Sequence, residues 1–170
     1  PDEFETGCTV RPRHSASRAK LRRYSGGAVK KFSHDDHRLL VQWALDCAER
    51  VAPLFETVAP DDSRPVNAID TGRAWVDTGV FSMKVIRSAS LAAHAAAKDV
   101  AACAAAAHAA HAAGQAVAAA HVAQHAYGSA YYALRALSSA SGEGGLTNVR
   151  AELDWQMSQL PAHLRDEVSK

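Results

Sequence analysis

The chain has 170 residues, a formal net charge of +1 and 48% hydrophobic residues, which suits one domain with a single buried core. It contains no apolar run of the length that a membrane span or a signal-peptide core requires. Its three cysteines are odd in number and widely spaced, which implies no disulfide framework and leads us to expect a cytoplasmic protein.

Residues 1–32 are rich in Arg, Lys, Ser and Gly without a hydrophobic period, which predicts a basic, flexible extension. Residues 1–31 hold eight Lys/Arg and three Asp/Glu, a net of +5, whereas the remainder holds eleven and fifteen, a net of −4. A basic arm could contact nucleic acid, but this one has almost no interleaved aromatic residues. We therefore expect a solvated tail, followed by a mildly acidic domain over residues 33–170.

A helix start is predicted at Ser33, because two acidic residues follow it in the first turn. Hydrophobic residues then keep a helical period over residues 39–58, where Pro53 is expected to kink or divide the helix. A second helix is predicted over residues 65–77 and should end at Gly79. Three of its charged residues share one arc at spacings of three and four, where they could form ion pairs on the surface or between helices: Asp70, Arg73 and Asp77.

Residues 88–126 are more than half alanine, the best helix former, and no proline lies between Pro65 and Pro161. Helix is therefore predicted over residues 82–138. One continuous helix of that length would span roughly 85 Å, whereas a compact domain of this size is only about 37 Å across. The stretch must fold back at least once, with Asp99 as the best N-cap for a break, and with Gly114 and residues 122–124 as weaker positions. Alanine-faced helices can approach closely, so we expect a thin central hairpin.

The first part of this stretch, residues 82–98, is predicted to place an apolar face that includes Val85 and Ile86 toward the core. Four polar residues should lie on its opposite face: Arg87, Ser90, His94 and Lys98. After the alanine-rich stretch come a loop over residues 138–145, a helix capped at Thr147 or Asn148, and a short helix from Pro161 to about Val168. The predicted fold is all-α, a compact bundle of about six or seven helices around an alanine-rich central helical hairpin.

His121 and His125 stand four residues apart, a spacing that can place two imidazoles on one helix face for metal binding. Two ligands are too few, and a third could come only through the fold, from His94, His108, His111 or Cys103. A helical wheel places His121 and His125 on an inward stripe, where a hydrogen-bonded core role is commoner than ligation. The wheel also predicts a solvated stripe formed by His108, His111 and Gln115.

No catalytic residue is predicted. Cys47 and Cys103 lie in apolar helical contexts that favour inert thiols. Neither pair of adjacent glycines, Gly26-Gly27 or Gly144-Gly145, has the flanking pattern of a phosphate-binding loop. The tryptophans are expected to supply core volume that alanine lacks.

Three segments together resemble the alanine-rich immunity proteins of bacterial polymorphic toxin systems, the five-like immunity family. These are LLVQWALDCAERVAPLFE from Leu39, AIDTGRAW from Ala68, and the run from Leu91 to Leu137, which contains LAAHAAAK and AAGQAVAAAHVAQHAYGSAYYALRAL. The resemblance implies an all-helical fold and binding to a cognate toxin. By position, it implies these binding residues: Asp70, Arg73, Trp75, His94, His121 and His125. The chain departs from the family where it has Gln115 in place of an expected His, and Ala123 where some relatives have proline.

The leading hypothesis is thus a cytoplasmic protein that binds and neutralises a cognate bacterial toxin, without catalysis and without a cofactor. The alternative is a small-molecule or divalent-metal enzyme that uses His94, His121 and His125 with Asp70 and Arg73. Exposed alanine faces could also pair with a second copy to form a homodimer. Nucleic-acid binding is expected only through the basic tail, and membrane binding is not expected.

Overall fold

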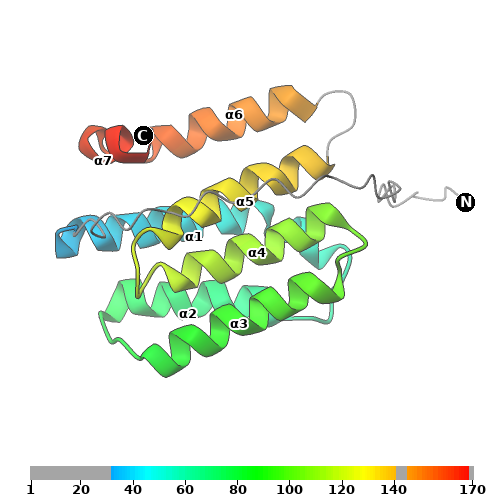
Figure 1. Ribbon diagram of the computed structural model, residues 1–170, viewed down its shortest axis with the longest axis horizontal. Helices are drawn as coiled ribbons and strands as arrows, with labels where there is room; N and C mark the ends of the chain where they lie inside the picture. The colour runs from blue at the N-terminus through cyan, green and yellow to red at the C-terminus, as the bar shows by residue number, and fades with distance from the viewer. Residues whose placement is uncertain (1–31, 141–144, 169–170) are drawn as a thin grey trace, which may run out of the picture.

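The computed structural model describes residues 32–140 and 145–168, and within these residues the chain forms seven helices and no strand (Figure 1). The helices are α1 (His34–Glu56), α2 (Arg64–Thr78), α3 (Met83–Asp99), α4 (Ala104–Ala118), α5 (His125–Ala140), α6 (Gly145–Ser158) and α7 (Ala162–Val168). The predicted all-α bundle is confirmed, while the predicted extension lies outside the described residues, Phe32 excepted. No helix among those described has both the length and the apolar character needed to cross a bilayer.

The ends of the first helices follow local signals in the sequence. Ser33 is the N-cap of α1, where its Oγ accepts a hydrogen bond from the backbone N–H of Asp36 at 3.1 Å. Gly79 ends α2 in the left-handed conformation, with φ of 68°, and its N–H donates to the Trp75 carbonyl at 2.8 Å. Pro53 lies in the last turn of α1 and does not divide it, contrary to one of the two expected outcomes. Helix α6 begins at Gly145, two residues before the earlier of its predicted caps.

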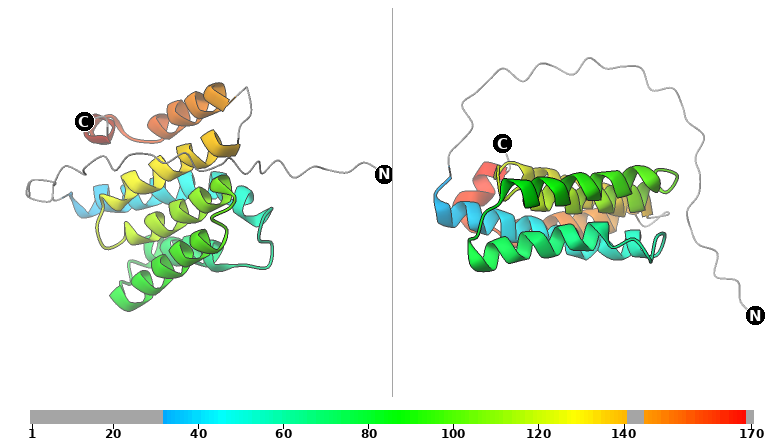
Figure 2. Two further views of the ribbon diagram at one scale, coloured as in Figure 1. Left: turned by 45° about the vertical axis from the view of Figure 1, so that its right-hand side comes forward. Right: turned by 90° about the horizontal axis from the view of Figure 1, so that it is seen from below.

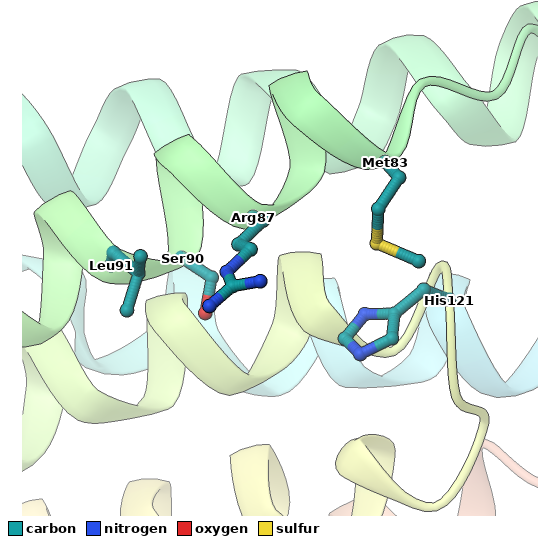
Figure 3. A pocket seen from close by; sticks show the side chains of 5 residues that line it. All are labelled: Met83, Arg87, Ser90, Leu91 and His121. Atoms are coloured by element: carbon teal, nitrogen blue, oxygen red, sulfur yellow. The ribbon is translucent and has the colours of Figure 1, made fainter.

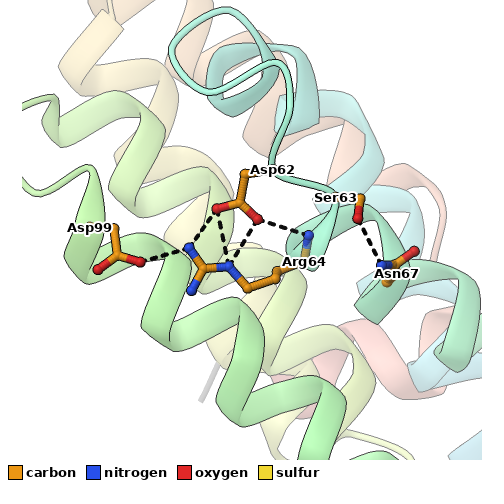
Figure 4. A network of polar contacts seen from close by, with 5 residues as sticks. All are labelled: Asp62, Ser63, Arg64, Asn67 and Asp99. Carbon is orange, nitrogen blue, oxygen red and sulfur yellow. Dashed lines mark hydrogen bonds and ion pairs between the residues drawn. The ribbon is translucent and has the colours of Figure 1, made fainter.

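The alanine-rich stretch folds back twice, between α3 and α4 and again between α4 and α5. Gly114 lies inside α4 and causes no break. Asp99 is the last residue of α3 and does not cap α4; its carboxylate accepts a hydrogen bond from Arg64 Nη2 at 2.7 Å (Figure 4). Arg64 also pairs with Asp62 at 2.6 Å, so one guanidinium joins the start of α2 to the end of α3.

Helix α4 is the centre of the bundle, because it packs against α1, α2, α3 and α5. The close approach of three helices is visible at Ser129 on α5, whose buried Oγ lies 2.9 Å from the Ala44 carbonyl of α1 and 3.0 Å from the Ala112 carbonyl of α4. Backbones come this near only where side chains are small. The large core residues come mainly from α1, and they include Leu40, Trp43, Leu45, Val51 and Phe55. The thin alanine-rich centre is therefore present.

Helices α6 and α7 cover one edge of the bundle, beside α5, whereas α3 lies on the opposite side (Figures 1 and 2). Buried Trp43 of α1 reaches across to α6, where its Nε1–H donates to the Gln156 carbonyl at 2.8 Å. An ion pair joins the same two helices, between Arg50 on α1 and Glu152 on α6 at 2.8 Å. These two contacts attach α6 directly to α1.

Candidate functional site

The six residues that the family resemblance singles out fall into two groups. Asp70, Arg73 and Trp75 lie on α2, whereas the three histidines lie on α3, on α5 and in the α4–α5 connection. Across residues 32–140 and 145–168, no hydrogen bond, ion pair or ring contact joins one group to the other.

The α2 group connects helices. Arg73 Nη2 lies 2.6 Å from Asp46 and 2.7 Å from Glu49, both on α1. Arg73 thus forms ion pairs between helices, whereas Asp70 and Asp77, with which the sequence grouped it, are exposed on α2 and are not its partners.

Trp75 is buried, as expected of a residue that supplies core volume. Its ring centroid lies 5.3 Å from that of His37, whose Nε2 is 2.7 Å from the Ala119 carbonyl. A carbonyl only accepts, so this Nε2 carries a proton and donates. Trp75 therefore supports the histidine that joins α1 to the end of α4.

The histidine group is larger than the resemblance suggests. His94 Nδ1 on α3 lies 2.9 Å from His111 Nδ1 on α4, and a hydrogen bond at this distance requires one ring nitrogen to donate and the other to accept. The His111 ring in turn lies 5.0 Å from that of Tyr132 on α5. His94 and His111 therefore join the three helices that the alanine-rich stretch forms.

A second pair of imidazoles lies further along the same interface. His125 Nδ1 is 2.7 Å from Gln115 Oε1, and the amide oxygen accepts, so Nδ1 carries the proton and Nε2 keeps its lone pair in the neutral ring. The His121 and His125 ring centroids lie 5.1 Å apart, although the chain leaves helix between residues 118 and 125. We call the five imidazoles the histidine cluster: His94, His108, His111, His121 and His125.

The predicted solvated stripe is wrong. His108, His111 and Gln115 are each half-buried, and two of them hydrogen-bond to the histidines that the resemblance implies. Two glycines in the sequence, Gly114 and Gly128, could have indicated that these polar side chains pack between helices. A Cβ at Gly114 would lie 2.8 Å from His94 Cε1, and one at Gly128 would lie 3.0 Å from Gln115 Oε1. Glycine in a helix costs about 1 kcal/mol relative to alanine, so a glycine among so many alanines marks a position where a methyl group does not fit.

Burial, the largest cause in each case, lowers the pKa of four imidazoles below the ordinary 6.5: His94, His108, His111 and His125. Nearby positive charges act in the same direction, Lys98 on His94 and His111, and Arg135 on His108. Two ring nitrogens, His108 Nδ1 and His121 Nδ1, are buried and make no hydrogen bond to the described part of the chain. These four imidazoles are thus favoured in their neutral form at pH 7.

Stability is expected to fall as the pH is lowered below 6.5. The unfolded chain takes up protons at the ordinary histidine pKa, whereas in the folded protein the four imidazoles with a lowered pKa take them up only at lower pH. Between the two pKa values the unfolded state holds more protons, so acid shifts the equilibrium toward unfolding. Urea midpoints at pH 7.5, 6.5 and 5.5 measure this. A His111→Asn variant should flatten the profile, and His34→Gln, which removes a ring that is 77% exposed, is the control for loss of an imidazole outside the cluster.

Gly114→Ala is expected to lower the free energy of unfolding by about 1–2 kcal/mol. Overpacking costs about 1–3 kcal/mol, and the better helix propensity of alanine returns up to about 1 kcal/mol. In a His94→Ala background the clash is gone, so the same change should stabilise the protein by up to about 1 kcal/mol. Denaturant titration of the four proteins in this cycle tests the contact, and an equal effect of Gly114→Ala in both backgrounds would contradict it.

The chemistry available to the described residues is limited. Across residues 32–140 and 145–168, no three His, Cys, Asp or Glu side chains gather in a way that could hold a metal ion. Cys47 is buried, and burial, followed by the charges of Glu152 and Asp46, raises the pKa of its thiol. This thiol is inert, as predicted from its sequence context.

His121 also lines an open depression of about 450 Å³ on the surface, between α3 and the α4–α5 connection (Figure 3). We call this depression the α3 surface, and it is lined by Met83, Arg87, Ser90, Leu91 and His121. Helix α3 is turned about its axis relative to the predicted orientation. Ser90 and His94 face neighbouring helices, whereas Val85, which was predicted to face the core, is exposed.

Comparison with known proteins gives one match. Residues 30–163 match the family model described as Imm-5 like putative immunity protein, and this range covers most of the chain. A search of curated proteins found no match, and neither did a search of solved structures. The matched range contains α1 to α6, both groups of implied residues and the α3 surface. The chain therefore belongs to the Imm-5 like putative immunity protein family.

Proposed function

We propose that this protein neutralises a cognate bacterial toxin by binding to it, without catalysing a reaction. The family match over residues 30–163 is the observation that carries this proposal. The bonding within the site supports it, because several of the side chains that could act as acids, bases or ligands hold one another in place. His94 bonds to His111, His125 to Gln115, and Arg73 to two carboxylates.

The distribution of charge favours a basic target such as a nuclease toxin. Residues 46–77 contain seven Asp/Glu and three Lys/Arg, whereas residues 78–98 contain three Lys/Arg and no acid. Charges separated in this way speed the encounter with a target that carries a basic patch for the acidic segment and a carboxylate for residues 78–98, and they orient it before contact. Affinity at contact then depends on the buried groups, not on this long-range term.

Co-expression with the neighbouring genes tests the proposal. Each adjacent open reading frame is induced in a bacterial host with and without this protein, and growth is measured. One neighbour should arrest growth alone, lose that effect when this protein is present, and co-purify with it in a fixed ratio. If no neighbour is toxic and none co-purifies, the proposal is rejected.

A second candidate function is metal binding by His121 and His125, with His94 nearby. One observation favours it: His121 Nδ1 is buried without a hydrogen-bond partner in the described structure, beside the His125 ring. Only two imidazoles would bind, so water or a partner would have to complete the coordination. Asp70 and Arg73, which the enzyme version also requires, lie on α2, where Arg73 is already paired.

Elemental analysis of the purified protein decides this second candidate. It predicts a stoichiometric divalent metal that is lost in His121→Ala and retained in His163→Ala. His163 is a suitable control because it is exposed on α7, where it contacts Asp36. Substoichiometric metal in the wild-type protein would remove the candidate.

A further inference from the structure

We propose that the toxin docks on the α3 surface through a segment that places an apolar side chain in the depression and a carboxylate against Arg87. This inference rests on the proposed function and names the surface that performs it. Three observations support it: the position of the exposed apolar residues, the depression between α3 and His121, and the positive charges beside that depression that make no ion pair with the described residues.

Exposed large hydrophobic side chains are concentrated around the start of α3. Leu91 is 58% exposed and Val80 is 75% exposed. Phe81, Met83 and Val85, which lie between them in the sequence, are exposed as well. No other segment of twelve described residues holds as many. Two of these side chains, Met83 and Leu91, line the depression itself, and apolar exposure gathered in this way marks interaction sites in soluble proteins.

The shape suits a protruding side chain. Met83, Arg87 and Leu91 follow one another at intervals of four residues, so they form one stripe along α3. His121 faces this stripe from the α4–α5 connection and closes the far side of the depression (Figure 3). A volume of about 450 Å³ can receive one bulky side chain. The depression is open and has few converging polar groups, whereas small-molecule sites enclose most of their ligand.

The charge beside the depression is available for binding. Arg50, Arg64 and Arg73 each pair with a carboxylate of this chain. By contrast, neither Lys84 nor Arg87 makes an ion pair with any of the described residues, and both are exposed. An arginine at the edge of an apolar depression is a typical interface anchor, because it can hold a carboxylate through two parallel hydrogen bonds.

A second copy of this chain fits the surface less well. A two-fold dimer across α3 would bring Lys84 and Arg87 near the same residues of the other copy. Residues 78–98 contain no acid to offset that repulsion. The charge therefore favours a partner that carries its own carboxylate.

Matched substitutions on opposite sides of the bundle test the inference. Arg87→Glu and Leu91→Asp change the α3 surface. Arg150→Glu and Leu153→Asp make the same changes on α6, where both residues are exposed, Leu153 by 43%. Calorimetry measures the affinity of each full-length variant for an inactivated form of the toxin encoded beside its gene. We expect both α3 variants to weaken binding by about 10-fold to 100-fold, and both α6 variants to bind as the wild type does.

A charge exchange tests the chemistry of the partner. Exposed Asp and Glu residues of the toxin are changed to Arg one at a time, and one of these variants should recover affinity for Arg87→Glu. Thermal unfolding of every variant checks that the fold is retained, and the milder pair Arg87→Gln and Leu91→Ser replaces any variant that unfolds.

The possible failures can be told apart. If wild-type protein binds and neutralises the toxin and the α3 variants do so equally well, the surface is wrong while the proposed function stands. If Leu91→Asp converts a dimer into a monomer without loss of toxin affinity, a second copy occupies the surface and the inference is overturned. If the wild type neither binds nor protects, the proposed function falls, and the inference with it.

Discussion

Replacing Trp43 with alanine is expected to lower the free energy of unfolding by about 3–5 kcal/mol. The side chain is only 2% exposed and lies between α1 and α6, where its Nε1–H donates to the Gln156 carbonyl. The alanine variant loses the buried ring and leaves a cavity that the surrounding helices cannot fill. Because this contact attaches α6 to α1, amide exchange in α6 should accelerate more than in α4.

Chemical denaturation of Trp43→Ala measures the total loss in the free energy of unfolding, and Trp43→Phe separates the contribution of packing from that of the hydrogen bond. Phenylalanine keeps most of the apolar volume but cannot donate to the carbonyl, so we expect a smaller loss of about 1–2 kcal/mol. Trp155→Phe on α6 is the matched control, since that side chain is only partly buried. A loss below about 1 kcal/mol for Trp43→Ala would contradict the packing described for this residue.

Replacing Arg50 with alanine is expected to cost about 2–4 kcal/mol. Its partner Glu152 is 4% exposed, so loss of the guanidinium leaves a nearly buried carboxylate that, among the described residues, keeps only the hydrogen bond from the Gln156 amide, at 3.2 Å. The expected loss is somewhat below that of a fully buried pair, because the Arg50 side chain is 44% exposed and water can reach it. Arg50 also lies over the Trp155 ring at 3.9 Å, so part of the loss is cation–π contact.

A double-mutant cycle distinguishes the stranded charge from the lost packing. Glu152→Gln removes the charge and keeps the shape, so in the Arg50→Ala background it should recover at least about half of the loss. Arg64→Ala serves as the comparison. It breaks pairs whose carboxylates, those of Asp62 and Asp99, are more exposed than that of Glu152, and it should cost no more than about 1 kcal/mol. If Glu152→Gln recovers nothing, the stranded carboxylate is not the cause.

The contacts of the histidines could not be predicted from the sequence. Family resemblance grouped His94, His121 and His125, and in the structure each of these rings lies beside another imidazole. The residues that hold them, His111 and Gln115, were assigned to solvent. A helical wheel gives each side chain an angle about its own axis and does not say which arc another helix will cover. Arg73 illustrates the same limit, since its partners Glu49 and Asp46 lie on another helix, 24 and 27 residues earlier in the chain.

The α3 surface could not be found from the sequence for a related reason. Val85 and Ile86 are both apolar, and the pattern alone placed both in the core. The structure buries Ile86, exposes Val85, and turns Ser90 inward. The depression also depends on His121, which lies beside α3 in space but is separated from it in the sequence by the whole of α4. Exposure is a property of the assembled helices and not of a single segment.

The sequence by itself determined the helical class, the caps at Ser33 and Gly79, and the need for the alanine-rich stretch to fold back. These features depend on local backbone preferences and on chain length, which are independent of the rest of the molecule. Only the tertiary structure decided how the alanine-rich helices are rotated and which imidazoles meet. The physical reason is the methyl group itself: alanine presents the same small apolar surface on every side of α4, so such a helix has little preferred direction of its own. The bulky residues of α1, and the space left by Gly114 and Gly128, set the orientation instead.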